Sequence, residues 1–175
     1  KRNKESKTLG LWCGRQRKNY KNSKLSQNKI NLLNSLEFDW DPLETDWQNK
    51  FAEFKQFKKE RDHASTSERG KEFGSLGLWC SVQRRNHING KLSQERIDLL
   101  NSLNFDWDPL ETNWQNYFSE LKQFRKEHGH TSPSEKRKEF GALGRWCTNQ
   151  RRNYKQGKLS QERFDLLDSI KFRWN

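Results

Sequence analysis

Hydrophobic and polar positions along this chain recur with a period of 67 residues. Three segments, which begin at Leu9, Leu76 and Leu143, align without a gap and each open on L-G-x-W-C. Two further stretches, which begin at Trp47 and Trp114, match each other and precede the second and third segments. A period this long, with its own set of Trp and Phe residues, predicts repeats that each close their own core.

Apolar spacing in the third repeat predicts its first two helices. Residues spaced by three or four positions on one face predict helix 1: Trp114, Phe118, Leu121, Phe124 and His128. A second stripe predicts helix 2, with Phe140, Leu143, Trp146, Cys147, Gln150 and Tyr154 on one side. Gly157 follows this stripe and suits a left-handed C-terminal cap.

Helix 3 is predicted from its start signals. Ser160 stands where an N-cap is expected, and Leu159 and Phe164 have the spacing of a hydrophobic staple around it. Phe172 and Trp174 are expected to close the repeat just beyond the end of this helix.

These patterns predict an all-α chain of tandem small three-helix bundles. We expect a partial repeat, helices 2 and 3 only, at residues 1–40, and complete repeats at 41–107 and 108–175. Asp41–Asp46 and Asp108–Asn113 are interpreted as short connections, with Asp before Pro at a turn or first helical position.

The segments rich in Ser, Gly and charge are predicted to be loops between helices 1 and 2. They are Asp62–Glu72 and Gly129–Glu139, and Lys1–Thr8 matches only the end of such a loop. A helix pair without helix 1 exposes Trp12, so we expect the partial repeat to pack on the second repeat or on another chain.

Composition adds a strong positive charge to this picture. The formal net charge is +12 and divides into +7, 0 and +5 over the three repeats. No apolar run is long enough for a transmembrane segment, and no signal peptide is evident, so we expect an intracellular protein of the cytoplasm or nucleus. Because the sequence lacks Met, we expect it to be part of a longer polypeptide.

The charge has a regular distribution at a finer scale. Residues 9–24, 76–91 and 143–158, which cover helix 2 and the following turn, contain no acidic residue in any repeat. Arg and Lys in such a segment can neutralise phosphates and release counterions, although a basic face can also serve solubility alone. The candidate nucleic-acid-binding residues are Arg15, Arg17, Lys18, Lys21, Lys24, Arg84, Arg85, Lys91, Arg145, Arg151, Arg152, Lys155 and Lys158.

Polar and aromatic residues near helix 2 have two possible roles. Gln83 and Gln150 lie one turn beyond the Trp and on its face, where they can read a base edge or satisfy a core group. Tyr20 and Tyr154 lie one turn further on and can stack on a base or complete the core. The spacing favours the structural role for both pairs.

Catalytic and metal-binding motifs are missing from the sequence. It contains no phosphate-binding loop, no H-E-x-x-H and no G-x-S-x-G, so we expect no enzyme activity, no cofactor and no small-molecule substrate. The H-G-H of the third repeat, His128–His130, is matched by R-D-H in the second, so a pair of histidines occurs in one repeat only, which argues against a metal site. Cys13, Cys80 and Cys147 occur once per repeat in an apolar helical stretch and are expected to be reduced core thiols.

The combined pattern W…F…[FL]…F followed by LGxWC…QRxN…KLSxER…FxW resembles the helicase-associated domain. This family consists of small three-helix repeats found in tandem, often beside a superfamily 2 helicase core, and the resemblance covers nearly the whole chain. It implies an all-helical fold and an accessory nucleic-acid-binding role, with DNA expected in preference to RNA and no catalytic residue to carry over. The first repeat departs from the pattern at Ser23 and at Asn28-Lys29.

The alternative function is a protein-interaction module. Such a module docks on the rest of its own polypeptide or on an acidic partner. An exposed apolar patch in place of a continuous basic stripe distinguishes it from a nucleic-acid binder.

Overall fold

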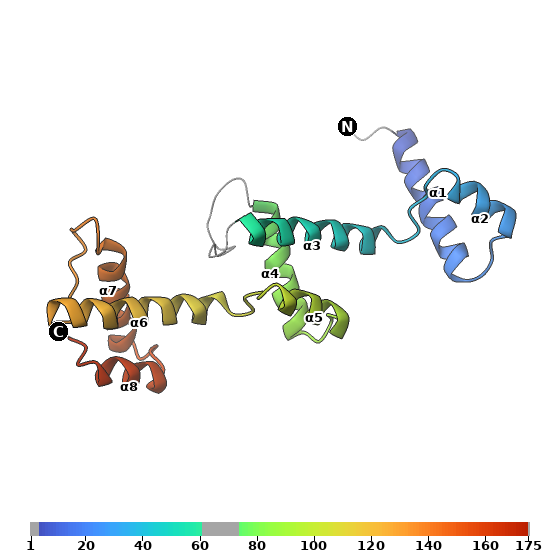
Figure 1. The fold of residues 1–175 in the computed structure, drawn as a ribbon. Helices are drawn as coiled ribbons and strands as arrows, with labels where there is room; N and C mark the ends of the chain where they lie inside the picture. Colours follow the sequence, from blue (N-terminus) through green and yellow to red (C-terminus); the bar gives the residue numbers. More distant parts are fainter. Residues whose placement is uncertain (1–3, 61–73, 175) are drawn as a thin grey trace. The chain divides into compact units, whose positions relative to one another are not determined.

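The computed structural model describes residues 4–60 and 74–174, and the chain divides into two units, Lys1–Arg85 and Asn86–Asn175. The described residues contain helices and no strand, so the predicted all-α class is confirmed (Figure 1). The helices are α1 (Lys4–Lys21), α2 (Gln27–Asn34), α3 (Pro42–Glu60), α4 (Gly74–Ile88), α5 (Gln94–Ser102), α6 (Pro109–His128), α7 (Gly141–Lys155) and α8 (Gln161–Ser169). None of these helices is long and apolar enough to cross a membrane.

The third repeat, which lies in the second unit, packs α6, α7 and α8 around one aromatic core (Figure 1). The core residues predicted from the apolar stripes are buried there: Trp114, Phe118, Leu121, Phe124, Leu143, Trp146, Cys147, Leu167, Ile170 and Phe172. Trp174 packs edge-on against Phe172, with ring centroids 4.8 Å apart, so these two residues close the repeat as predicted.

Local signals set the ends of the helices. Ser160 Oγ accepts a hydrogen bond from the Arg163 N–H at 3.3 Å, which confirms the predicted N-cap of α8. Gly157 has φ 64°, as expected for a left-handed position after α7. Asp108 caps α6, and Pro109 is the first residue of the helix. Of the two predicted positions for Pro, the first helical position is therefore correct, and most of the connection expected at Asp108–Asn113 is helical.

A buried side-chain hydrogen bond joins helix 1 to helix 2 in both complete repeats. Trp47 Nε1 donates to Gln83 Oε1, and Trp114 Nε1 donates to Gln150 Oε1, each at 3.1 Å. Since an unpaired indole N–H is costly in an apolar core, the glutamine fixes how α3 sits on α4 and how α6 sits on α7.

The loop between α6 and α7 is held against the core of its repeat. Thr131 is buried, and its hydroxyl donates to the Lys171 carbonyl and accepts from the Arg173 N–H. Glu135 lies so close to α7 that a Cβ placed on Gly144 would be 2.8 Å from its backbone nitrogen. The Gly of the L-G motif therefore permits this close approach. The corresponding predicted loop, Asp62–Glu72, lies outside the described residues.

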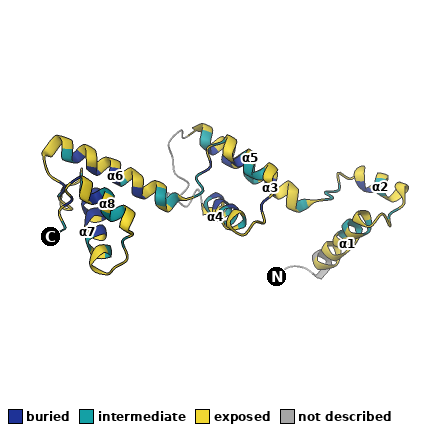
Figure 2. Ribbon diagram, turned by 90° about the horizontal axis from the view of Figure 1, so that it is seen from below, coloured by how far each residue is buried: buried dark blue, intermediate teal, exposed yellow. Residues whose placement is uncertain are grey.

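The first repeat differs from prediction at its start. Helix α1 begins at Lys4, so the loop expected over Lys1–Thr8 is wrong from this residue onward. No Gly or Pro interrupts the segment, and its local propensity therefore extends the helix. In Figure 2, α1 is coloured intermediate and exposed along its described length, whereas α7 carries buried positions. Cys80 and Cys147 are buried free thiols, as expected, but Cys13 is only half-buried.

Candidate nucleic-acid interface

Helix α7 separates its apolar and basic side chains onto different faces. Leu143 and Trp146 are buried in the core, whereas Arg145, Arg152 and Lys155 are exposed. Because a helix turns once every 3.6 residues, positions 145, 152 and 155 lie on the side away from the core. Lys158, in the turn after α7, is also exposed, so this predicted basic segment is accessible to solvent.

Helix α1 presents a comparable set of basic side chains. Arg15 and Lys18 are exposed on the helix, and Lys24 is exposed in the following turn. Lys21 is exposed as well, and its ammonium nitrogen lies 3.7 Å from an Asp41 carboxylate oxygen. A surface ion pair of this kind contributes little energy and leaves the lysine available.

The middle repeat has a weaker basic face. Arg85 on α4 and Lys91 in the next turn are exposed. However, Leu78 and Ile88 are also exposed, and they occupy the positions of Arg145 and Lys155 in the third repeat. The second helix of this repeat, whose net charge is zero, therefore exposes apolar side chains beside its basic ones.

Two of the predicted phosphate-binding arginines have structural contacts. Arg17 Nε donates to the Asp39 carbonyl at 2.8 Å, and Arg151 Nε donates to the Arg173 carbonyl at 2.7 Å. Each guanidinium also lies over a Phe ring of the segment after helix 3, Phe38 or Phe172, about 5 Å from the centroid. These arginines hold helix 2 to the end of the repeat, and their contact with phosphates remains a prediction.

Arg84 and Arg152 complete the predicted set. Arg84 is half-buried, like Arg17 and Arg151 at the same position of the other repeats. Arg152 is exposed, and its guanidinium donates a hydrogen bond to Oδ1 of Asn149, one turn earlier on α7, at 2.8 Å. The neighbouring arginines of Q-R-R therefore differ in environment, and only the second is fully on the solvent face.

The structure favours the structural alternative for the two glutamines. Gln83 and Gln150 are buried, and their carbonyl oxygens accept the indole hydrogen bonds described above. A buried carboxamide that is already engaged cannot reach a base edge. Both glutamines therefore have the structural role that their spacing favours.

The two tyrosines are partly occupied by neighbouring rings. Tyr20 stacks on Trp40, with centroids 4.2 Å apart, and Tyr154 stacks on Phe164 at 5.2 Å and contacts Trp174 at 4.6 Å. Each phenol nevertheless keeps more than two fifths of its surface exposed. The rings therefore extend the core to the surface, and the base-stacking role remains a prediction for their outer edges.

A hollow of about 340 Å³ lies beside Arg145, and the sequence patterns gave no indication of it. Asn113 and Tyr117 from α6 line it together with Arg145, Trp146 and Asn149 from α7. The Tyr117 ring stacks on Trp146 with centroids 5.7 Å apart. The second repeat has Lys50 at the position of Tyr117, so the aromatic wall of this hollow is not part of the repeated pattern. Aromatic faces beside amides and a guanidinium suit a planar polar group such as a nucleobase.

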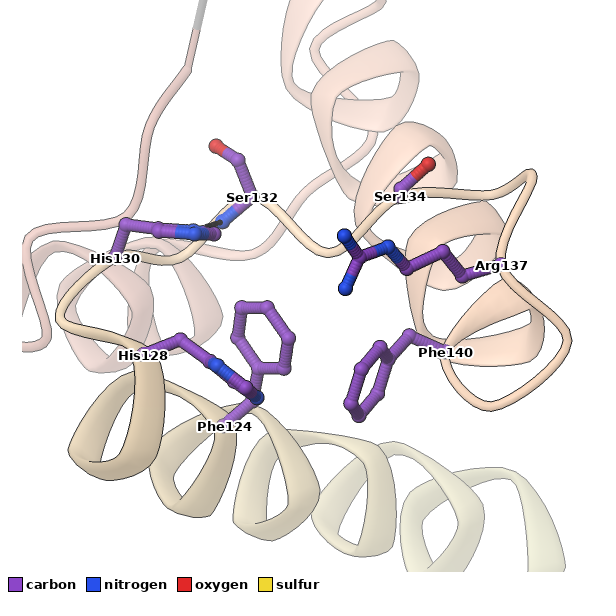
Figure 3. Close-up of a pocket in the computed structure, with 7 residues that line it drawn as sticks. All are labelled: Phe124, His128, His130, Ser132, Ser134, Arg137 and Phe140. Carbon is purple, nitrogen blue, oxygen red and sulfur yellow. Dashed lines mark hydrogen bonds between the residues drawn. The ribbon is translucent and has the colours of Figure 1, made fainter.

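A second hollow of about 230 Å³ lies under the loop between α6 and α7 (Figure 3). The Arg137 guanidinium points into it between the Phe124 and Phe140 rings, with His128 and His130 at the other end. Its lining contains no carboxylate, so its polar groups suit an anionic or neutral ligand. Among the residues with described positions, no three His, Cys, Asp or Glu side chains form a cluster that can hold a metal ion.

Comparison with known proteins identifies the repeat. The model of the helicase associated domain matches three successive segments, residues 1–41, 44–108 and 111–175. No curated protein matches the chain, and no solved structure matches it. The three matches together cover nearly the whole sequence and coincide with the three copies of the L-G-x-W-C pattern. The chain therefore belongs to the helicase-associated domain family.

Proposed function

We propose that the chain is a non-catalytic, nucleic-acid-binding accessory array of a larger helicase-like or multidomain protein. Helix 2 and the following turn of each repeat contact the phosphate backbone in a largely sequence-independent way. The observation that carries this proposal is the exposed basic face that α1 and α7 form within the acid-free segments 9–24 and 143–158.

The geometry of α7 supports backbone contact. Arg145, Arg152 and Lys155 are exposed on the side opposite the core, with one or two turns of helix between them. Several cations on one rigid surface can approach successive phosphates without rearrangement of the fold. The sequence-independent part of nucleic-acid binding comes from contacts of this type.

The repeats are expected to contribute unequally. The third repeat carries Arg145 where the first and second carry exposed Leu11 and Leu78, and the first and third carry Lys21 and Lys155 where the second carries exposed Ile88. We therefore expect α1 and α7 to provide most of the affinity. About three phosphate contacts from each of two repeats give a log–log salt slope near about −5 on duplex DNA.

The hollow beside Arg145 supports an additional contact with a single strand. Tyr117, which stacks on the buried Trp146, offers aromatic surface, and Asn113 and Asn149 offer amide groups, next to a residue of the basic face. An unstacked base can occupy such a site, whereas a base paired in a duplex cannot enter it. Tyr117→Ala is therefore expected to weaken binding to single-stranded more than to duplex nucleic acid.

The test is a fluorescence-anisotropy titration against single-stranded and duplex DNA and RNA at two salt concentrations. The triple variant Arg145→Glu, Arg152→Glu, Lys155→Glu is expected to weaken binding at least tenfold. Its matched control carries three exposed charges of the same repeat outside the acid-free segment, Lys126→Glu, Lys136→Glu and Lys138→Glu. Equal weakening by both variants would show that only net charge matters and would refute the assigned face.

Poly-glutamate serves as the second control. An acidic polypeptide that competes as well as DNA would favour the protein-interaction alternative, in which the basic face binds an acidic partner. Transfer of the α7 pattern to α4 by Leu78→Arg and Ile88→Lys is expected to steepen the salt slope by about 2, because each added phosphate contact adds about −0.9. An unchanged slope would contradict backbone contact by this face.

A further inference from the structure

The loop between α6 and α7 carries a cationic side chain that is not part of the basic face. Arg137 extends from this loop into the hollow beneath it, and its guanidinium lies between the Phe124 and Phe140 rings (Figure 3). Among the described residues, no carboxylate pairs with Arg137, and none lines the hollow. The guanidinium therefore offers a positive charge and several N–H donors to a ligand.

The acidic residues nearest along the chain to this hollow lie outside its lining. The Glu127 carboxylate accepts a hydrogen bond from the Gln123 amide at 2.5 Å, and the Glu135 carboxylate accepts one from the Thr148 hydroxyl on α7. Glu139 is exposed to solvent and does not line the hollow. The potential inside the hollow is therefore positive and favours an anion.

Further side chains add donors to the same hollow. The Ser132 N–H donates to His130 Nδ1 at 3.2 Å, so the neutral imidazole carries its proton on Nε2, which can donate to a ligand. Ser134 Oγ accepts from the Lys136 N–H at 3.3 Å, which leaves the hydroxyl proton available. His128, the last residue of α6, lines the hollow as well. The donors thus come from the end of a helix and from several points of the loop.

Contacts within the repeat hold the loop that carries these donors. Thr131 is buried and bonded to the segment after α8, and Pro133 is buried next to it. Within the loop, the Arg137 N–H donates to the Ser134 carbonyl at 3.3 Å, and the Phe140 N–H donates to the Arg137 carbonyl at 3.2 Å. Because the loop is ordered in this way, a ligand meets donors that are already in place, which lowers the entropic cost of binding.

The size and shape of the hollow restrict its ligand. Its volume is about 230 Å³, below the ~300–1,000 Å³ that is typical of pockets for drug-sized ligands, so it suits a small group. The Phe124 and Phe140 rings meet edge to face, with centroids 5.0 Å apart, and offer no pair of parallel faces to a base. Since the donors reach the hollow from several directions, a tetrahedral oxyanion matches them better than a planar carboxylate.

A phosphate monoester has the required properties. It carries about 1.5–2 negative charges at pH 7 and three strong acceptor oxygens. It is attached at one end only, so it can enter a hollow beneath a loop. We propose that this hollow binds the phosphoryl group of a phosphate monoester, with Arg137 as its main ligand and His130 and Ser134 as further donors.

The proposed site is specific to the third repeat and does not rest on the function proposed for the basic face. The second repeat has Gly70 at the position of Arg137, so the guanidinium is not part of the repeated pattern. A phosphate monoester has two possible sources, the end of a nucleic-acid strand or a phosphorylated small molecule. Both present the same group to the hollow, and experiment can distinguish them.

The first test is a titration of the chain with phenyl phosphate, followed by amide-resolved NMR. Saturable shifts are expected for the amides of Ser132, Ser134 and Arg137. Arg137→Gln is expected to weaken binding at least tenfold. The matched control, Lys138→Gln, removes an exposed charge of the same loop outside the lining and should change the affinity less than twofold. Phenyl sulfate, which has a similar shape and a lower charge, should bind more weakly than phenyl phosphate.

Two results would overturn the proposal. One is equal weakening by Arg137→Gln and Lys138→Gln, because net charge alone would then explain the binding. The other is the absence of saturable shifts at the lining amides of the unaltered chain. The amide signal of Arg173, which donates to the Thr131 hydroxyl, reports whether the loop stays docked in each variant. Arg137→Lys keeps the charge and loses the planar fork, so its affinity should be intermediate.

The second test identifies the source of the phosphoryl group. Single strands labelled with fluorescein at the 3′ end carry either a 5′-phosphate or a 5′-hydroxyl group. Tighter binding of the phosphorylated strand, with the preference lost in Arg137→Gln, would assign the site to a strand end. Equal binding of both strands, with phenyl phosphate still bound, would assign it to a phosphorylated small molecule.

Failure of this proposal and failure of the proposed function give different results. Replacement of Arg145, Arg152 and Lys155 by Glu should weaken both strands alike and change the affinity for phenyl phosphate less than twofold. Arg137→Gln should affect only the probes that carry a phosphate monoester. The strands that test the basic face have hydroxyl ends, so that test is independent of the hollow.

Discussion

The Gly of the L-G-x-W-C pattern has a different environment in the first and third repeats, which allows a matched test. A Cβ on Gly144 would lie 2.8 Å from the Glu135 backbone nitrogen and 3.0 Å from its Cα. These are backbone atoms of a loop held by Thr131, so they cannot move aside as a flexible side chain does. A Cβ on Gly10 would meet nothing within 4 Å.

Replacement of Gly by Ala at these positions has two effects on the stability of the helix, and the two effects have opposite signs. Gly→Ala within a helix adds about 0.5–1 kcal/mol of stability because Ala loses less backbone entropy on folding. Overpacking against a fixed neighbour costs about 1–3 kcal/mol. Gly10→Ala should therefore stabilise α1 by nearly 1 kcal/mol, whereas Gly144→Ala should leave α7 between unchanged and about 2 kcal/mol less stable. The difference between the variants measures the overpacking alone.

Hydrogen exchange with mass spectrometry suits this comparison, since it reports local opening for peptides from α1 and α7 separately. A stabilisation of about 1 kcal/mol slows exchange in α1 about fivefold. Exchange in α7 should stay unchanged or accelerate, and protection of the loop around Glu135 should fall. Equal stabilisation by Gly10→Ala and Gly144→Ala would refute the close approach of loop and helix.

Three further predictions follow from the same comparison of repeats. Gln150→Leu leaves the buried indole N–H of α6 without an acceptor and should cost about 1–3 kcal/mol in urea denaturation followed by circular dichroism. Ser23 has φ 54°, where Gly157 has φ 64°, so Ser23→Gly should stabilise and Gly157→Ser destabilise, each by about 1 kcal/mol in thermal denaturation. Iodoacetamide should modify Cys13 in the native protein and Cys147 only after unfolding, because burial raises the pKa of the Cys147 thiol to about 12.

Sequence reasoning predicted the helices and caps where the determining signals are local. The apolar stripe of α7, the left-handed Gly157 and the Ser160 cap depend on residues within one or two turns of one another. The starts of α3 and α6 did not follow from the sequence alone, because Asp-Pro is compatible with both a turn and a helix N-terminus. The start of α1 was predicted wrongly because Lys1–Thr8 was compared with the loops of the other repeats. Its local sequence from Lys4 onward is compatible with a helix.

The candidate site was only partly predictable because several of its contacts span long stretches of sequence. Arg151 bonds to a carbonyl 22 residues away, and neither the charge count nor the acid-free segment carries this information. The sequence does distinguish Gln150 from Arg152, because Gln150 continues the apolar stripe of Trp146 and Arg152 lies on the opposite side of the helix. The hollow beside Arg145 required the relative placement of α6 and α7, which becomes visible only in the folded repeat.

The same reasoning explains why identical motif residues have different environments in different repeats. The L-G-x-W-C pattern makes Leu143 and Trp146 core residues only because α6 supplies Trp114 and Phe118 about thirty residues earlier in the chain. Leu9 and Trp12 have the same local sequence and helical conformation, yet they stay exposed without such a helix. Burial in this family is thus a property of the complete three-helix unit.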